Sequence, residues 1–261
     1  MYDRIALYLP TYKRCEKLKK CIDSAIAKAD KKQRIDFCFL VNTSDTDTYA
    51  FIRNYPWPDG VGHELLQENT RQPNLAFYYN YIFDNTAFYA DTTVVSMLGD
   101  DMVFSTHSWD TRILEEVNKK DGEVIIHVDD GYIARGRMAV NLFTTRKIVS
   151  ATDRPYMCPA FHADMIDVVW YIVGQLSSTL VYLGDVVLMH EHETKKIDPM
   201  TRDETHQRLA PIQQVTNSKD NQRYALAYGT IAAANVINSG IGKWNIISSG
   251  TEIKTSREGG K

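Results

Sequence analysis

The sequence lacks several features that would place it in a special class of protein. Its 261 residues include only 4 cysteines, none in Cys-x-x-Cys spacing, which argues against a disulfide framework and a zinc knuckle. Its 14 glycines and 8 prolines are too few for a collagen-like or low-complexity chain. No apolar run approaches the roughly 18 residues that a membrane span needs, and residues 1–14 are too polar for a signal peptide. These absences favour a globular protein in a reducing, cytoplasmic setting.

Charge is uneven along the chain, although the net charge is only −3. Residues 11–34 hold 9 basic and 3 acidic side chains, residues 35–193 hold 10 and 23, and residues 194–261 hold 10 and 6. An acidic middle between basic ends suits a site that holds a cation and a phosphate together, and solvated helix faces are the alternative explanation. The net charge gives no general signal for nucleic acid.

Short apolar runs alternate with helical patterns over the first 120 residues. Buried strands are predicted at residues 5–9, 37–41, 63–67 and 93–98. Amphipathic helices are predicted at residues 18–29, 49–55, from Pro73 onward, and 109–117. Strands joined by helical crossovers form parallel sheets, and ligands bind beyond the carboxyl ends of their strands. This rule selects the turns at residues 10–14, 42–45, 69–74 and 99–101.

The second half of the chain is less regular. Residues 123–128 and 138–144 are predicted strands around a loop, residues 165–176 a broad apolar helix, and residues 180–189 a strand broken by Gly184. A polar stretch begins at Thr194, a helix is predicted at 221–238, and residues 254–261 form a tail that we expect to be disordered.

Two adjacent carboxylates, Asp100 and Asp101, follow one of the buried strands. The two negative charges repel each other, and burial removes their hydration, so the pair is costly unless a positive group lies beside it. A hard divalent cation such as Mg²⁺ or Mn²⁺ would supply that charge and bind substrate phosphate as well. The alternatives are a helix N-cap and a solvated turn.

Two histidines end the last predicted strand. His190 and His192 are two positions apart, so they would point to the same face of a strand. An imidazole can complete a carboxylate site for Mn²⁺ or a similar ion. Surface histidines are the alternative.

Other charged side chains suit phosphate binding or proton transfer. Arg14 and Arg71 lie on loops at strand ends, where they could hold phosphate. Asp164 and Asp167 open the apolar helix, where a carboxylate facing the ligand crevice could act as a general base. Favourable interaction with the helix dipole is a sufficient structural reason for either acid.

Taken in order, these segments resemble the family 2 glycosyltransferases with the GT-A fold. Residues 7–14 resemble the opening strand and Pro-Thr-Tyr-x-Arg turn, and residues 97–103 the DxD-type metal motif. Residues 41–45 stand at the Asp-rich base-binding turn, with Asn42 where Asp is common, and residues 68–80 match the third segment. Residues 105–110, 164–170 and 184–192 resemble the later motifs of a phage-associated branch. The similarity spans residues 4–205.

The resemblance implies an α/β fold of the GT-A (nucleotide-diphospho-sugar transferase) type, with a mostly parallel central sheet flanked by helices. Residues 1–205 would form this domain, and residues 206–261 a C-terminal helical extension and tail. The implied roles are nucleotide binding by Pro10, Thr11, Tyr12, Arg14, Asn42, Asp45, Arg71 and Asp100, metal binding by Asp101, His190 and His192, and proton abstraction by Asp164 or Asp167.

The implied activity is metal-dependent, inverting transfer of a sugar to an acceptor hydroxyl. Mn²⁺ or Mg²⁺ would be the cofactor and a UDP-sugar the first donor to consider. The phage branch suggests DNA carrying a hydroxylated base as acceptor, in the host cytoplasm if the protein is viral. A cell-envelope glycan or a protein is the alternative acceptor.

Two other classes of function compete with this interpretation. A nucleotidyltransferase would carry a glycine-rich loop near the first strand, and residues 10–13 contain no glycine. A non-catalytic nucleotide-sugar-binding or glycan-binding module would not need a base at residues 164–167.

Overall fold

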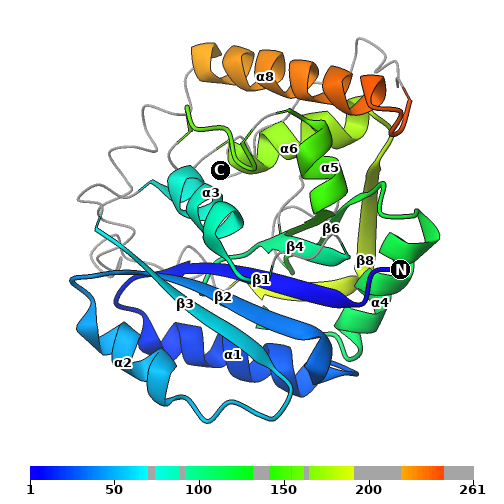
Figure 1. The fold of residues 1–261 in the computed structure, drawn as a ribbon. Helices are drawn as coiled ribbons and strands as arrows, with labels where there is room; N and C mark the ends of the chain where they lie inside the picture. Colours follow the sequence, from blue (N-terminus) through cyan, green and yellow to red (C-terminus); the bar gives the residue numbers. More distant parts are fainter. Residues whose placement is uncertain are drawn as a thin grey trace, which may run out of the picture.

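The computed structural model describes residues 1–69, 74–88, 92–131, 141–153, 155–161, 165–190 and 219–243. Its described strands form one sheet in the order β3-β2-β1-β4-β7-β6-β8-β5 (Figure 1). The strands are β1 (Arg4–Thr11), β2 (Ile35–Asn42), β3 (Gly62–Glu68), β4 (Thr93–Met97), β5 (Met102–Phe104), β6 (Ile125–Asp129), β7 (Leu142–Thr145) and β8 (Leu180–His190).

The direction of the strands gathers most of their carboxyl ends at one edge of the sheet. β1 is parallel to β2 and β4, and β2 is parallel to β3. β7 is antiparallel to both β4 and β6, so β4 and β6 run the same way, and β8 is parallel to β6. The mostly parallel sheet expected from the sequence is confirmed, and its carboxyl edge is where ligands bind in such sheets.

Helices cover both faces of the sheet (Figure 1). One face carries α1 (Cys15–Lys28), α2 (Thr46–Asn54) and α4 (Trp109–Lys119). The other face carries α3 (Leu75–Asn85), α5 (Arg146–Ala151), α6 (Ile166–Leu176) and α8 (Lys219–Asn238).

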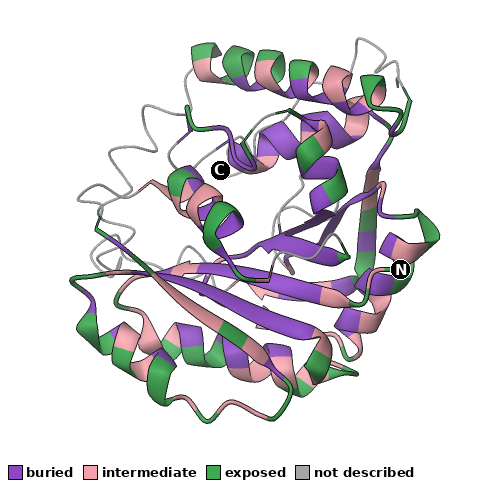
Figure 2. Cartoon of the chain, in the orientation of Figure 1, coloured by how far each residue is buried: buried purple, intermediate pink, exposed green. Residues whose placement is uncertain are grey.

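The residues of β1 show why the sheet needs both helical layers. Ile5, Leu7 and Leu9 pack into the cluster under α1, whereas Ala6 and Tyr8 pack into the cluster under α3 and α6. All five side chains are fully buried, so an apolar run becomes a strand covered on both faces, as Figure 2 shows. Burying each large aliphatic side chain contributes about 1.5–3 kcal/mol.

Most predicted elements are confirmed, with three corrections. The short strand β5 and the helix α5 were not expected from the sequence. β8 is not broken at Gly184, since it runs continuously from Leu180 to His190 with a shift in its pairing to β6 after Leu183. The predicted strand 138–144 begins outside the described residues, and its described part falls in β7.

The predicted helix at 221–238 is α8, which packs on α6. Its buried residues Ala225, Ala232 and Val236 belong to the same apolar cluster as Tyr8 in the sheet. The expected boundary at residues 205 and 206 lies outside the described residues, as does the tail at 254–261. Among the described helices, none has both the length and the apolar character needed to span a membrane.

Candidate active site

The acid pair lies immediately after β4, at the carboxyl edge of the sheet. Asp100 and Asp101 are only 4% and 5% exposed, and they form the turn into β5. α3 supports this turn from one side, because the buried Tyr79 hydroxyl donates a hydrogen bond to the Leu98 carbonyl oxygen at 2.6 Å. Burial raises the pKa of Tyr79, so its hydroxyl stays protonated and remains a donor.

Arg14 supplies the positive charge that the acid pair requires. Its Nη1 lies 2.9 Å from Asp100 Oδ1 and 3.6 Å from Asp101 Oδ2. Arg14 lies three residues after the end of β1 and directly before α1, so chain connectivity brings it to the end of the neighbouring strand β4. The residue before it, Lys13, has φ of 53°, and this left-handed turn directs the chain into α1.

The predicted nucleotide-binding residue Thr11 is also part of this cluster. Its hydroxyl donates a hydrogen bond to Asp100 Oδ2 at 2.8 Å, and both side chains are buried. Asp100 therefore receives donors from two residues of the β1–α1 connection, Thr11 and Arg14.

His190 reaches the acid pair from the end of β8. Antiparallel pairing of β5 with β8 sets Met102 opposite His190. This register places His190 Nε2 3.2 Å from Asp101 Oδ1. The sequence-predicted grouping of these two residues is therefore present in the structure.

Burial and neighbouring charges shift the two carboxyl groups in opposite directions. Burial raises the pKa of Asp100, and the Asp101 charge adds to this effect while Arg14 opposes it. Burial also acts upward on Asp101, but the hydrogen bond and charge of His190, followed by Arg14 and Lys17, lower its pKa to about 2. Asp101 is thus an anion at neutral pH, the form that binds a cation.

Asn42 and Asp45, expected at the base of a nucleotide, form local hydrogen bonds here. Asn42 Nδ2 donates to Glu68 Oε1 at 2.7 Å. Asp45 is buried and caps α2 by accepting from the Thr48 amide, and its second oxygen accepts from the Lys13 amide at 2.6 Å. These bonds join the turns after β1, β2 and β3 into one surface.

The remaining predicted residues are placed as follows. Pro10 pairs with Leu40 within the sheet, and Tyr12 is half-buried with the Lys13 ammonium 5.2 Å from its ring centre. Asp167 lies in the first turn of α6, where its Oδ1 accepts from the Val168 amide at 2.9 Å. Three further predicted residues lie outside the described residues: Arg71, Asp164 and His192.

Three further residues contribute to this edge: Glu68 and Asp130 were not singled out from the sequence, and Gly99 lies in the turn 99–101 that the sequence selected. Glu68 ends β3, is only 7% exposed and accepts the Asn42 hydrogen bond. Asp130 follows β6, is 6% exposed, and its carbonyl oxygen accepts from the His190 amide at 3.1 Å. A Cβ at Gly99 would lie 2.7 Å from Asp101 Oδ1, so a side chain there would displace that carboxylate. Position at the carboxyl end of a strand is the signal that could have found Glu68 and Asp130.

The described residues contain no group of three or more His, Cys, Asp or Glu side chains arranged to hold a metal ion. Asp101 and His190 nevertheless bring a carboxylate oxygen and an imidazole nitrogen within 3.2 Å of each other. Mg²⁺ and Mn²⁺ sites often use one or two protein side chains and take their other ligands from substrate phosphates and water. The donor set fits a cation shared with a diphosphate better than a cation held by protein alone.

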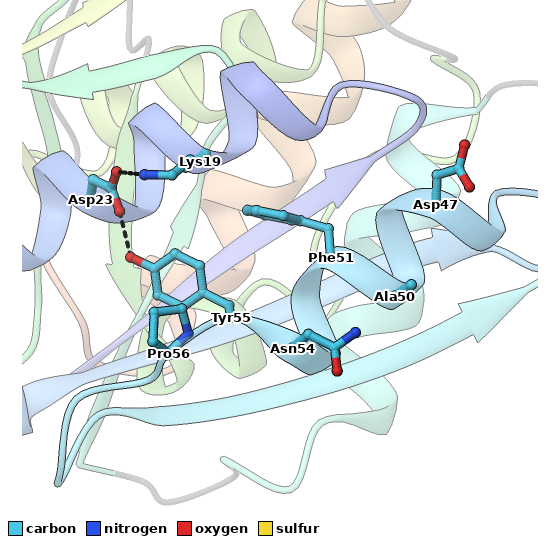
Figure 3. Close-up of a pocket in the computed structure, with 8 residues that line it drawn as sticks. All are labelled: Lys19, Asp23, Asp47, Ala50, Phe51, Asn54, Tyr55 and Pro56. Atoms are coloured by element: carbon cyan, nitrogen blue, oxygen red, sulfur yellow. Dashed lines mark hydrogen bonds and ion pairs between the residues drawn. The ribbon is translucent and has the colours of Figure 1, made fainter.

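A surface pocket of about 430 Å³ lies away from this cluster, between α1 and α2 (Figure 3). Asp23 accepts hydrogen bonds from Lys19 and from the Tyr55 hydroxyl on its wall. The described lining residues are Lys19, Asp23, Asp47, Ala50, Phe51, Asn54, Tyr55 and Pro56, which include none of the predicted site residues.

Comparison by sequence gives no relative: no family model matches the chain, and no curated protein matches it. Comparison by structure does. A mannosyltransferase of Pyrobaculum calidifontis, in complex with GDP-Man and Mn²⁺, superposes with a TM-score of 0.57 at 12% identity, over 92% of this chain and 80% of that one. Residues 1–349 of S. aureus TarS give 0.56 at 9% identity, over 90% and 72%. Glucosyl-3-phosphoglycerate synthase of Mycobacterium tuberculosis, in complex with UDP, gives 0.54 at 12% identity, over 89% and 80%.

This chain has the GT-A fold. At sequence identities this low, the structural similarity shows the fold alone. The chemistry of the chain therefore has to be argued from its own residues. In this GT-A fold, Thr11, Arg14, Asp100, Asp101 and His190 meet at the carboxyl edge of the sheet.

Proposed function

We propose that this protein is a glycosyltransferase that moves a sugar from a nucleoside diphosphate to an acceptor hydroxyl, with a divalent cation. The single observation that carries the proposal is the buried acid pair with Arg14 and His190 at the ligand-binding edge of a GT-A fold. A buried anion such as Asp101, beside an imidazole and a guanidinium, suits a cation and a diphosphate bound together.

The donor in this proposal is a UDP-sugar bound across the turns after β1, β2 and β4. TarS has a structure in complex with UDP, as does the mycobacterial synthase, whereas the mannosyltransferase holds GDP-Man. Pro10, Thr11 and Tyr12 would line the nucleotide. Asn42 or Asp45 would face the base with Arg71 near it, and Asp100 would contact the ribose or the metal. Asp101 would hold the cation with His190, and His192 is the further candidate ligand.

The reaction breaks the bond between the anomeric carbon and the β-phosphate oxygen, and it forms a bond from that carbon to the acceptor oxygen. Negative charge grows on the departing diphosphate, and the cation, when bound, stabilises that charge. Arg14 can hold the same phosphates through charge-assisted hydrogen bonds. The acceptor proton would pass to a carboxylate, Asp167 or Asp164. The acceptor oxygen would attack the anomeric carbon from the side opposite the leaving diphosphate, which inverts the configuration.

The proposal places the acceptor at the same carboxyl edge of the sheet. DNA carrying a hydroxylated base is the first acceptor to test, because the sequence resembles a phage-associated branch and residues 11–34 are rich in basic side chains. A cell-envelope glycan or a protein hydroxyl is the alternative, and an acceptor panel separates these classes by product mass.

The deciding experiment is a panel of nucleotide sugars with and without Mn²⁺, read by thermal shift and by donor hydrolysis. We expect one donor to raise the melting temperature only with Mn²⁺, and Asp101→Asn to lose this effect. Asp84→Asn, an exposed acid on α3, is the matched control and should behave as wild type. If Asp101→Asn kept the full Mn²⁺-dependent stabilisation by the donor, a metal-diphosphate site at Asp101 would be contradicted. Binding without hydrolysis or transfer would favour a non-catalytic binding module.

The proposed base is tested separately by Asp164→Asn, Asp167→Asn and the double variant. Loss of a positioned general base lowers kcat by about 10² to 10⁴, with donor affinity retained. Full transfer activity in the double variant would remove both residues from the base role.

A further inference from the structure

We propose that Arg14 is an exchangeable counter-ion of the acid pair, which the divalent cation displaces and which then binds the donor diphosphate. This inference rests on the proposed function and goes further by predicting that cation and donor bind cooperatively.

The first step concerns the space beside the acids. The Arg14 side chain is only 10% exposed, and those of Asp100 and Asp101 are 5% and 6% exposed. Its Nη1 approaches one oxygen of each acid, at 2.9 Å and 3.6 Å. A divalent cation bound to Asp101 would meet this guanidinium at close range, and like charges in a buried site repel strongly. The guanidinium and the cation therefore compete for the same carboxylates.

The second step concerns what Arg14 can do when it is displaced. Its backbone is fixed, since its carbonyl oxygen accepts the Leu18 amide hydrogen bond in the first turn of α1 at 2.9 Å. The exchange therefore requires the side chain to change rotamer about this fixed point. A guanidinium released in a buried site needs a new anion, and a diphosphate offers two parallel oxygens for its two N–H groups.

The third step is the linkage between the ligands. Without a diphosphate, a cation that enters separates Arg14 from both acids and offers it no phosphate in exchange, so the cation binds weakly. With a diphosphate, the cation and Arg14 both gain partners, so each ligand strengthens the binding of the other by the same factor.

The test measures Mn²⁺ affinity without and with UDP, using the electron paramagnetic resonance signal of free Mn²⁺. We expect Arg14→Gln to bind Mn²⁺ alone about tenfold more tightly than wild type, within the usual range of coupling between sites. We also expect UDP to improve Mn²⁺ affinity less in this variant than in wild type. Arg112→Gln removes a surface ion pair with Asp185 and serves as the matched control, with wild-type Mn²⁺ affinity expected.

A second measurement keeps the inference testable if Arg14→Gln is unstable. Without the Arg14 charge, Asp100 and Asp101 repel each other, so Arg14→Gln should have a lower melting temperature than wild type in EDTA. Mn²⁺ alone should raise the melting temperature of Arg14→Gln more than it raises that of wild type. Arg14→Lys keeps the charge and should bind Mn²⁺ alone as weakly as wild type. Unchanged or weaker Mn²⁺ binding by Arg14→Gln would overturn the exchange, even if donor and cation still bind to wild type. If no nucleotide binds to wild type with any cation, the proposed function fails, whereas the Mn²⁺ comparison still decides the exchange between Arg14 and the cation.

Discussion

Gly99 lies between the end of β4 and the two acids, and its missing side chain leaves room for the Asp101 carboxylate. A Cβ at this position would lie 2.7 Å from Asp101 Oδ1 and 3.6 Å from the Met102 terminal methyl. The atom that would have to move, Asp101 Oδ1, belongs to a side chain and not to the backbone. The fold can therefore accept the change, but the Asp101 carboxylate would leave its present position. The glycine thus serves the geometry of the site more than the stability of the chain.

Gly99→Ala should therefore separate activity from stability. We expect its donor hydrolysis in Mn²⁺ to fall about 100-fold, since small misplacements of a catalytic group have effects of that size. Its free energy of unfolding in urea should change by less than about 1 kcal/mol. A large loss of stability with activity retained would contradict this role.

Thr11 offers a test of the buried hydrogen bond to Asp100. Thr11→Val keeps the shape of the side chain but removes the donor at 2.8 Å, which leaves a buried carboxylate with one partner fewer. We expect a loss of about 1–3 kcal/mol in the free energy of unfolding by urea. Thr111→Val removes a similar bond to Asp30 at the exposed surface and should cost at most about 0.5 kcal/mol. Equal losses in the two variants would contradict the dependence on burial.

At the scale of single residues, the sequence predicted which side chains gather but not how they pair. Asp100, Asp101, Thr11 and Arg14 follow parallel strands, and that order alone brings them to one edge. The pairing of Arg14 with both acids depends on the left-handed turn at Lys13, and no sequence pattern pointed to it. The effect of Gly99 needs coordinates, because it depends on the direction of one carboxylate.

At the scale of elements, β5 shows the limit of pattern-based prediction. Its three residues are too few to show a period, and they become a strand because β8 pairs with them and Trp109 packs against Phe104. β8 in turn continues past Gly184, since pairing with β6 and then β5 outweighs the preference of a glycine to interrupt a strand. This tertiary pairing delivers His190 to the acids.

α4 is fixed to the turn after α1 by a buried carboxylate. Asp110 is fully buried, and its two oxygens accept from the amides of Asp30 and Lys31 at 2.7 and 3.0 Å. Asp110→Ala leaves both amides without their hydrogen-bond acceptor, and we expect it to lower the free energy of unfolding by about 3 kcal/mol. Asp84→Ala, on the exposed side of α3, is the control and should change it by less than about 0.5 kcal/mol. Urea titration decides, and equal values for the two variants would refute the anchoring role of Asp110.

At the scale of the whole molecule, the acidic middle and the basic start of the sequence meet at one edge. The positive charge of Lys17 on α1 helps to lower the pKa of Asp101, although the two residues are more than eighty positions apart in the sequence. The parallel-sheet rule predicted only that the turns at residues 10–14 and 99–101 lie at this edge. The sequence did not predict that α8 would share a core with the sheet, because its apolar residues show only a weak helical stripe.

Gly229 tests whether α8 folds together with the rest of the protein. A Cβ there would lie 2.8 Å from the Ile172 methyl on α6, so Gly229→Val pushes the two helices apart. We expect a cost of about 1–3 kcal/mol and a single, lowered calorimetric transition. Ala227→Val, exposed on the same helix, should cost no more than about 0.7 kcal/mol. Two separate transitions in wild type would show that α8 is independent of the sheet.

The four cysteines have a consequence for chemical labelling. Cys21, Cys38 and Cys158 are buried thiols outside any disulfide, whereas Cys15 is partly exposed, one residue after Arg14. A maleimide dye should therefore modify one thiol of the native protein quickly and the other three only after unfolding, as counted by mass spectrometry. A nearby guanidinium favours the reactive thiolate form of a cysteine. If donor and Mn²⁺ draw Arg14 toward a diphosphate, they should therefore slow the labelling of Cys15. Rapid modification of two or more thiols in the native protein would contradict this order. If only Cys15 reacts, a fluorescent label can be attached there to report donor binding without any substitution.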